Sequence, residues 1–182
     1  RGRSAFPAEP QGRPEESDFR GVNTSRMELK SPRHGSDLIK QICYSFGASL
    51  AGITKVKKEW VYQGNLRGTG RVDFEVPAHW QYAIVIAVPH EWDSMYANPT
   101  YGTSYDAYSK LRFIAGKMEV FIKELGYSAR PHVPLTSYVL VMPPLAIDAG
   151  LGEQGRNGIL ITPELGANTR LAAITTDMPL EA

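Results

Sequence analysis

The residues whose spacing is most suggestive of chemistry lie in a glycine-rich stretch near the C-terminal end of the chain. Gly150, Gly152 and Gly155 fit the pattern G-x-G-x-x-G. That pattern binds the pyrophosphate of a dinucleotide when the glycines follow a strand and open a helix. Here the segment before the glycines has the pattern of a short helix, and the segment after them has that of a strand ended by Pro163. This order disfavours a nicotinamide or flavin site and leaves two readings, a tight connection or a backbone surface that contacts another cofactor.

A second set of candidates is a group of tyrosines at the start of a long amphipathic segment. Apolar side chains recur at helical spacing from Tyr108 to Leu125, which predicts a helix that starts near Ser104 and ends at Gly126. Tyr108 belongs to the apolar face of that helix. A tyrosine in this position is either a core residue whose hydroxyl bonds to a backbone group, or a partly buried phenol that can donate a proton.

Several segments in the second half of the chain form a joint pattern. They are Leu125-Gly126-Tyr127-Ser128-Ala129, Pro143-Pro144-Leu145-Ala146-Ile147, the glycine-rich run 149–166, Thr169-Arg170-Leu171 and Thr176-Asp177-Met178-Pro179-Leu180. Together they resemble the corrinoid-dependent reductive dehalogenases, and the resemblance covers roughly residues 36 to 181. A shorter version of the glycine run occurs in the related epoxyqueuosine reductases, but the pieces around Pro163 and Asp177 look like the dehalogenases.

The resemblance implies a cobalt corrinoid that is bound base-off, without a histidine ligand to the cobalt. It also implies an organohalide substrate, and a chlorinated hydrocarbon is the expected one. It also implies a tyrosine that donates a proton and a nearby basic residue that stabilises the tyrosinate. Tyr108 is the expected proton donor, with Tyr105 as the alternative, and Arg170 is the expected cation. An ion pair between Arg170 and Asp177 is the purely structural alternative.

The residues expected to bind the corrinoid are small, expose their backbone or form an apolar wall. Glycines allow the backbone to lie against the ring edge and the nucleotide tail. No metal-ligating side chains are expected, because His90 with the acidic residues after it matches no recognised metal site. The expected cofactor-binding set is Gly150, Gly152, Gly155, Arg156, Gly158, Thr162, Pro163 and Met142. Further candidates for the pocket wall are Trp60, Trp92 and Tyr96.

The composition is that of one globular domain. The chain has 182 residues, of which 42% are hydrophobic and 21% charged, enough to bury one sizeable core. A formal net charge of +1 gives no basic surface, so we expect no nucleic-acid partner. Cys43 is the single cysteine and is predicted to be a buried thiol, so these residues alone cannot form a thiolate-bound cluster.

Full-length members of the family carry a twin-arginine export signal before this region and two iron–sulfur cluster motifs after it. We therefore expect the chain to be a piece of a longer oxidoreductase, located at the outer face of the cytoplasmic membrane. Its electron donor would act through the iron–sulfur domain, and a membrane anchor protein is a further expected partner. Without the clusters, the chain alone is expected to bind corrinoid weakly or in part and not to turn over with a physiological donor.

The alternation of helix and strand patterns predicts an α/β (α+β) fold with a mixed central sheet covered by helices, and the resemblance implies a nitroreductase-like corrinoid domain. Residues 1–34 are expected to form an extended N-terminal arm, and residues 35–182 the corrinoid-binding catalytic domain. Ser36 is the expected N-cap of the first helix. Residues 81–88 are apolar on both faces and should form a central strand that is covered on both sides.

One position departs from the family pattern. Relatives often carry an asparagine that touches the substrate where this chain has Arg130-Pro131-His132. Thr136 or Ser137 would have to supply that hydrogen bond instead. His132 is expected to be a partly exposed loop residue, neither a ligand nor a base.

Two other functions fit parts of the same pattern. An epoxyqueuosine-reductase-like cobalamin enzyme would act on a tRNA base, which the near-neutral charge disfavours because tRNA binding needs a basic surface. A non-catalytic corrinoid-binding protein would keep the glycine run and use Tyr108 and Arg170 only structurally. Substitution of the tyrosine distinguishes the enzyme from the carrier.

Overall fold

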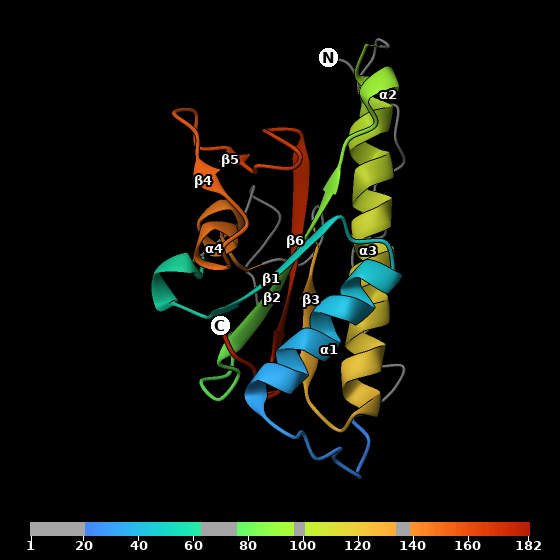
Figure 1. Ribbon diagram of the computed structural model, residues 1–182, viewed down its shortest axis with the longest axis vertical. Coiled ribbons are helices and arrows are strands. Elements are labelled where there is room, and N and C mark those ends of the chain that lie inside the picture. Colours follow the sequence, from blue (N-terminus) through green and yellow to red (C-terminus); the bar gives the residue numbers. More distant parts are fainter. Residues whose placement is uncertain (1–20, 63–75, 97–100, 134–138) are drawn as a thin grey trace, which may run out of the picture.

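A computed structural model gives the arrangement of residues 21–62, 76–96, 101–133 and 139–182 (Figure 1). Thr136 and Ser137 lie outside these ranges. The elements in chain order are α1 (Pro32–Ser45), β1 (Leu50–Lys55), the 3-10 turn η2 (Lys58–Trp60), β2 (Tyr82–Pro89), α2 (Trp92–Tyr96), α3 (Tyr101–Glu124), β3 (Ala129–His132), α4 (Met142–Asp148), β4 (Glu153–Gln154), β5 (Leu160–Ile161) and β6 (Thr169–Thr176). None of the helices in the described ranges is long and apolar enough to cross a membrane.

The main sheet has four strands in the order β1-β2-β6-β3, and β4 and β5 form a separate hairpin (Figure 1). Every pairing in the main sheet is antiparallel. The expected combination of sheet and helices is therefore present, but the prediction of a mixed sheet is wrong. Helix and strand patterns alternate along the chain in both kinds of sheet, so the alternation alone does not specify strand direction.

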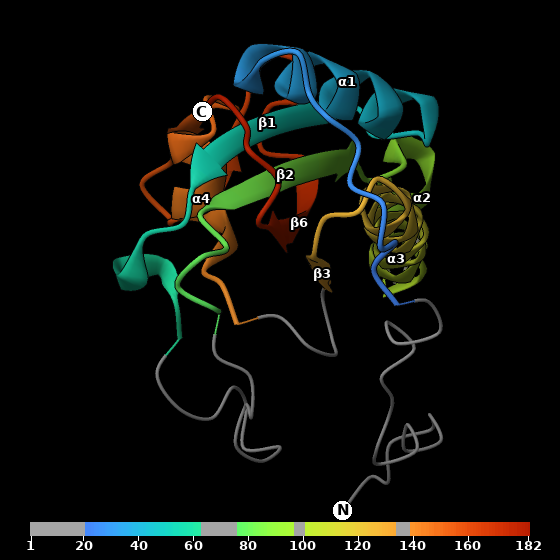
Figure 2. The same cartoon turned by 90° about the horizontal axis from the view of Figure 1, so that it is seen from below.

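Strand β2 lies at the centre of the fold, between β1 and β6, as its continuous apolar run predicts. Its side chains alternate between two apolar clusters. Ile84 and Ile86 belong to the cluster that includes residues of α1 and α3, whereas Ala83 and Val85 belong to the cluster that includes residues of α4. Helices α1 and α3 lie on one side of the sheet and α4 on the other (Figure 2). Cys43 is fully buried in the first cluster, which confirms the predicted structural thiol. Burial raises the pKa of this thiol to about 12.

Helix α1 begins earlier than predicted. The side chain of Ser31 accepts a hydrogen bond from the backbone N–H of His34 at 3.1 Å, and Pro32 occupies the first helical position. Ser36, the predicted N-cap, instead lies inside the helix and is buried. Its hydroxyl accepts from Glu181 N–H at 2.7 Å and donates to the Glu181 carbonyl at 3.0 Å, so it fixes the C-terminal segment against α1.

The segment before α1 packs against the C-terminal end of α3. The backbone N–H of Asn23 donates to the Lys123 carbonyl at 2.9 Å, and that of Met27 to the Leu125 carbonyl at 2.8 Å. Arg26 Nε donates to the Gly126 carbonyl at 3.0 Å. Carbonyls at a helix end have no partner within the helix, so this segment satisfies groups that would otherwise need water.

His132 is not a loop residue, which corrects the prediction. It lies in β3 with no exposed surface, and its Nε2 is 2.9 Å from Thr175 Oγ1 on the neighbouring strand. Burial, and secondarily the charge of Arg130, lower the pKa of His132 to about 3. The strand was not predicted, because residues 129–132 alternate only weakly between apolar and polar and include a proline.

This buried histidine makes stability depend on pH. The unfolded chain takes up the proton near pH 6.5 but the folded chain only near pH 3, so the unfolded state binds more protons between these values. The contribution is fully present above pH 6.5 and is lost as the pH falls, by about 2 kcal/mol between pH 6.5 and 5. Urea unfolding at both pH values should show this loss. His132→Gln, which does not titrate, should flatten the dependence, and an equal loss in both proteins would contradict the assignment.

Candidate active site

A cavity of about 640 Å³ lies where the C-terminal end of β2, the N-terminal part of α3, the start of α4 and the segment from β5 into β6 meet. Most of its lining side chains are apolar. The lining also includes two phenols, Tyr62 and Tyr108, the imidazole of His90 and the guanidinium of Arg170, which can transfer or orient a proton. Its lining residues are Tyr62, His90, Trp92, Met95, Tyr108, Met142, Pro143, Gly158, Ile159, Leu160, Leu165, Gly166, Ala167, Asn168, Thr169, Arg170 and Leu171.

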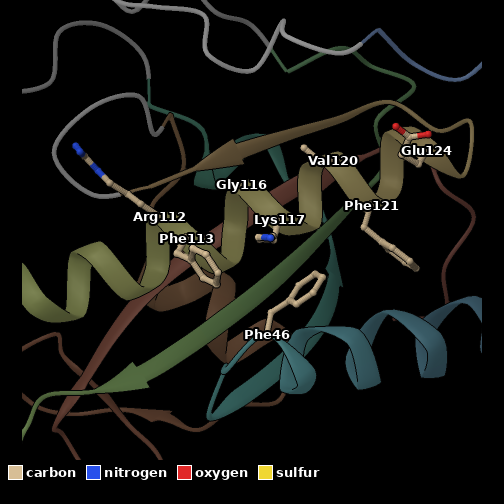
Figure 3. Close-up of a pocket in the computed structure, with 8 residues that line it drawn as sticks. All are labelled: Phe46, Arg112, Phe113, Gly116, Lys117, Val120, Phe121 and Glu124. Atoms are coloured by element: carbon tan, nitrogen blue, oxygen red, sulfur yellow. The ribbon is translucent and has the colours of Figure 1, made fainter.

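A second hollow of about 650 Å³ lies on the outer side of α3, beside the end of α1. Phe46, at the end of α1, and Phe113, Phe121 and Glu124, on α3, are among its lining residues (Figure 3). It contains none of the residues predicted for catalysis or cofactor binding. The first cavity is therefore the candidate site.

Tyr108 and Arg170 come together in the wall of the first cavity. The guanidinium of Arg170 lies over the Tyr108 ring, with 5.2 Å between Cζ and the ring centroid. Arg170 Nη2 also donates to Ser104 Oγ, one turn earlier on α3, at 3.2 Å. The cation–π contact and the hydrogen bond hold the cation on the face of the phenol. The structural alternative, an ion pair between Arg170 and Asp177, is wrong. Asp177 Oδ2 instead pairs with Arg26 Nη2 at 3.1 Å.

Tyr105, the alternative proton donor, does not line the cavity. Its side chain is exposed, and its ring stands edge-on to that of Tyr108, with 6.4 Å between centroids. Helix α3 begins at Tyr101 and not near Ser104 as predicted, so both tyrosines lie within regular helix. Positions three apart on a helix point in different directions by about 60°, which explains why one ring faces the cavity and the other faces out.

His90 and Asn168 form a linked pair that sequence reasoning did not find. Asn168 Nδ2 donates to the His90 carbonyl at 3.0 Å, and Asn168 Oδ1 is 2.9 Å from His90 Nδ1. Burial lowers the pKa of His90, the hydrogen bond to Asn168 raises it, and the charge of Arg170 lowers it further, with a net lowering. His90 follows β2 and Asn168 precedes β6, so only the antiparallel pairing of these strands brings them together.

The predicted glycines serve the hairpin of β4 and β5 in two ways. Gly150 and Gly158 have φ angles of +75° and +80°, which side chains rarely tolerate. A Cβ atom at Gly152 would overlap the carbonyl of Ile161, and one at Gly155 would lie 2.9 Å from Ile161 Cδ1. The backbone of this segment therefore requires Gly150, Gly152 and Gly158, whereas the nearest atom at Gly155 is the end of a flexible side chain. Gly158 also lines the cavity.

The other predicted cofactor-binding residues divide between the cavity and the surface. Met142 lines the cavity, whereas Arg156 and Pro163 are exposed and lie outside the lining. Thr162 is buried, and its Oγ1 accepts a hydrogen bond from the backbone N–H of Leu165 at 3.0 Å. The Thr162 hydroxyl thus stabilises the turn that follows β5.

The aromatic residues predicted for the pocket wall are also divided. Trp92 lines the cavity. Trp60 does not, and its Nε1 donates to Asp148 Oδ2 at 2.7 Å. Tyr96 is 83% exposed and outside the lining. Among the described residues, no group of three or more histidine, cysteine, aspartate or glutamate side chains could hold a metal ion.

No protein-family model matches the chain. The chain is 28% identical over 195 residues to the tetrachloroethene reductive dehalogenase of Desulfitobacterium hafniense, in an alignment that covers 85% of the chain. It superposes with a TM-score of 0.77 and 26% identity on a solved reductive dehalogenase described as B12-dependent, which covers 89% of the chain and 23% of that structure. The chain is thus similar in both sequence and fold to reductive dehalogenases.

The chain spans 35% of the length of the dehalogenase from D. hafniense. Another solved reductive dehalogenase, in complex with 3-bromo-4-hydroxybenzoic acid, gives a TM-score of 0.75 and 24% identity over 88% of the chain and 24% of that structure. An epoxyqueuosine reductase with a tRNA stem loop gives a TM-score of 0.57 and 18% identity over 80% of the chain and 46% of that structure. Because the sequence identities to these two structures are 24% and 18%, the two superpositions show a shared fold alone.

Proposed function

We propose that this chain provides the corrinoid-binding and proton-donating part of an enzyme that replaces the halogen of an organohalide, such as a chlorinated hydrocarbon, with hydrogen. The pairing of Tyr108 with Arg170 in the wall of the cavity carries the proposal. A phenol is a weak acid at neutral pH, and an adjacent cation stabilises the anion that it leaves. The two residues are 62 positions apart, and their meeting in one cavity gives a proton donor with a partner for its conjugate base.

The cavity is suited to the edge of a corrinoid, which is flat, apolar on its faces and surrounded by amides. Met142 and Leu165 provide apolar wall, and the backbone at Gly158 and Gly166 is open to close approach. Arg170 Nε is a buried donor that has no hydrogen-bond partner in the described part of the chain, and a carbonyl or hydroxyl in the cavity would satisfy it. These residues would hold the corrinoid edge base-off.

The reaction adds two electrons and one proton to the organohalide, so that a carbon–hydrogen bond replaces the carbon–halogen bond and halide leaves. When bound, the corrinoid supplies the electron chemistry. The chain contributes the rest. Apolar side chains exclude water, Tyr108 Oη donates the proton, and the Arg170 guanidinium over the ring stabilises the tyrosinate until it is protonated again.

The proposal extends to the longer protein. Electrons would come from a donor through two iron–sulfur clusters outside this chain. Export by the twin-arginine route and a membrane anchor protein would place the enzyme at the outer face of the cytoplasmic membrane. With such an arrangement, the chain alone needs an artificial reductant for turnover.

The direct test is halide release from an organohalide by the chain loaded with cobalamin and reduced with a low-potential chemical reductant. Free cobalamin at the same concentration is the control, because reduced cobalamin reacts slowly by itself. We expect faster release in the presence of the protein, with a rate that depends on Tyr108. A rate equal to that of free cobalamin would contradict the proposal and leave a carrier of corrinoid.

A further inference from the structure

Two polar atoms in the wall of the cavity make no hydrogen bond within the described part of the chain. They are Nε2 of His90 and Nε of Arg170, and both are shielded from solvent. Buried polar atoms in native proteins almost always have a partner, because an unpaired one is unfavourable. The two residues lie near each other where β2 and β6 pair, because Arg170 faces Val88 in the register and His90 bonds to Asn168.

The hydrogen bonds of Asn168 define which nitrogen of His90 carries the proton. Asn168 Nδ2 donates to the His90 carbonyl, so the amide group is oriented with its oxygen, Oδ1, toward His90 Nδ1. An amide oxygen can only accept, and therefore Nδ1 carries the hydrogen. Burial and the nearby guanidinium favour the neutral ring. In a neutral ring with hydrogen on Nδ1, Nε2 has a free lone pair and is an acceptor.

Arg170 supplies the opposite kind of group. Its guanidinium is always protonated and can only donate. Its Nη2 donates to Ser104 Oγ, and its guanidinium plane lies over the ring of Tyr108. These two contacts restrict the position of Nε. The wall thus contains an acceptor on His90 and a donor on Arg170, on residues that follow β2 and lie in β6 where the two strands pair.

We propose that His90 Nε2 and Arg170 Nε together bind a ligand group that donates and accepts at once, a hydroxyl or a primary carboxamide. The group would donate its hydrogen to His90 and accept from Arg170. Since this inference rests on the proposed function, two sources are available, a hydroxyl on the organohalide or a peripheral amide of the corrinoid. His90 is then a specificity-determining residue whose tautomer is set by Asn168.

A site of this kind selects against ligands that cannot donate, because they leave His90 Nε2 unpaired. The probes are 4-bromophenol and 4-bromoanisole, which differ by a methyl group that removes the donor. Calorimetric titration of the chain should show that bromophenol binds about ten to a hundred times more tightly. His90→Phe should abolish the preference, and His90→Gln, whose amide oxygen accepts, should restore part of it. His79→Phe, at an exposed histidine outside the cavity, is the matched control and should keep it.

The second arm titrates the same proteins with cobalamin. If His90→Phe loses the preference for bromophenol but keeps its affinity for cobalamin, the ligand group is a hydroxyl of the substrate. If the original chain shows no preference for bromophenol, and the variant binds cobalamin about tenfold more weakly, the ligand group is a corrinoid amide. Either result supports the proposal, and an unchanged variant in both arms overturns it.

Nitrogen NMR of the His90 ring provides a readout that needs no ligand. We expect hydrogen on Nδ1 and an unprotonated Nε2 at neutral pH, and loss of this single tautomer in Asn168→Leu. Hydrogen on Nε2 in the original chain overturns the proposal. If the original chain binds no cobalamin, the proposed function fails, while the tautomer and the bromophenol preference still decide this inference separately.

Discussion

Replacing Tyr108 with phenylalanine is expected to lower the rate of halide release by about a hundredfold to ten-thousandfold, the usual contribution of a positioned proton donor. Phenylalanine keeps the ring beneath the Arg170 guanidinium and so preserves the cation–π contact. It removes only the hydroxyl. Cobalamin affinity and the free energy of unfolding should therefore stay close to those of the original chain, and the loss should be confined to turnover measured with the artificial reductant.

The matched controls lie on the same helix. Tyr101→Phe removes a hydroxyl from an exposed side chain of α3 outside the cavity, and should leave the rate unchanged. A large loss in Tyr105→Phe, with little in Tyr108→Phe, would transfer the proton-donor role to the alternative residue. Full activity in both variants would show that neither Tyr108 nor Tyr105 donates the proton, and would contradict the proton-donor assignment.

Replacing Gly152 with valine is expected to lower the free energy of unfolding by about 3 kcal/mol or more. Any side chain there meets the backbone carbonyl of Ile161, which cannot move without opening the hairpin of β4 and β5. Urea unfolding without cobalamin gives the measurement. The loss should appear in the absence of any cofactor, because the contact lies within the protein.

Gly116 offers the matched control for this substitution. It lies inside α3, and an added Cβ atom would have nothing within 4 Å. Gly116→Ala should therefore stabilise the chain by about 0.5 to 1 kcal/mol through the helix propensity of alanine. A Gly152 variant as stable as the original chain would show that the hairpin tolerates a side chain, and would return this glycine to a role in cofactor contact alone.

Periodic patterns revealed the parts of the fold that depend on local sequence. The apolar run in β2 and the apolar face of α3 each predict an element and its buried side, and Cys43 lies on the buried face of α1. Strand direction depends on long-range pairing, which leaves no local periodicity, and the sheet was predicted incorrectly for that reason. The start of α1 was misplaced because Ser31 and Ser36 are both good capping residues.

The same distinction holds for the site. The resemblance named Tyr108 and Arg170, and the structure brings them into contact. The link between His90 and Asn168 depends on the register in which Pro89 of β2 faces Thr169 of β6. An asparagine after a glycine turn has no distinctive spacing, so it could not be singled out. The glycine run had a specific sequence pattern, but packing within the hairpin explains its spacing as directly as cofactor contact does.

The measurement that most directly tests the account is an ultraviolet–visible titration of the chain with cobalamin, which follows the change from the base-on to the base-off spectrum. We predict saturable binding with a base-off spectrum, weakened when Gly158→Val or Met142→Ala alters the lining of the cavity. If the spectrum stays base-on at high protein concentration, these residues do not form a corrinoid site. That result would also contradict the proposed role of Tyr108.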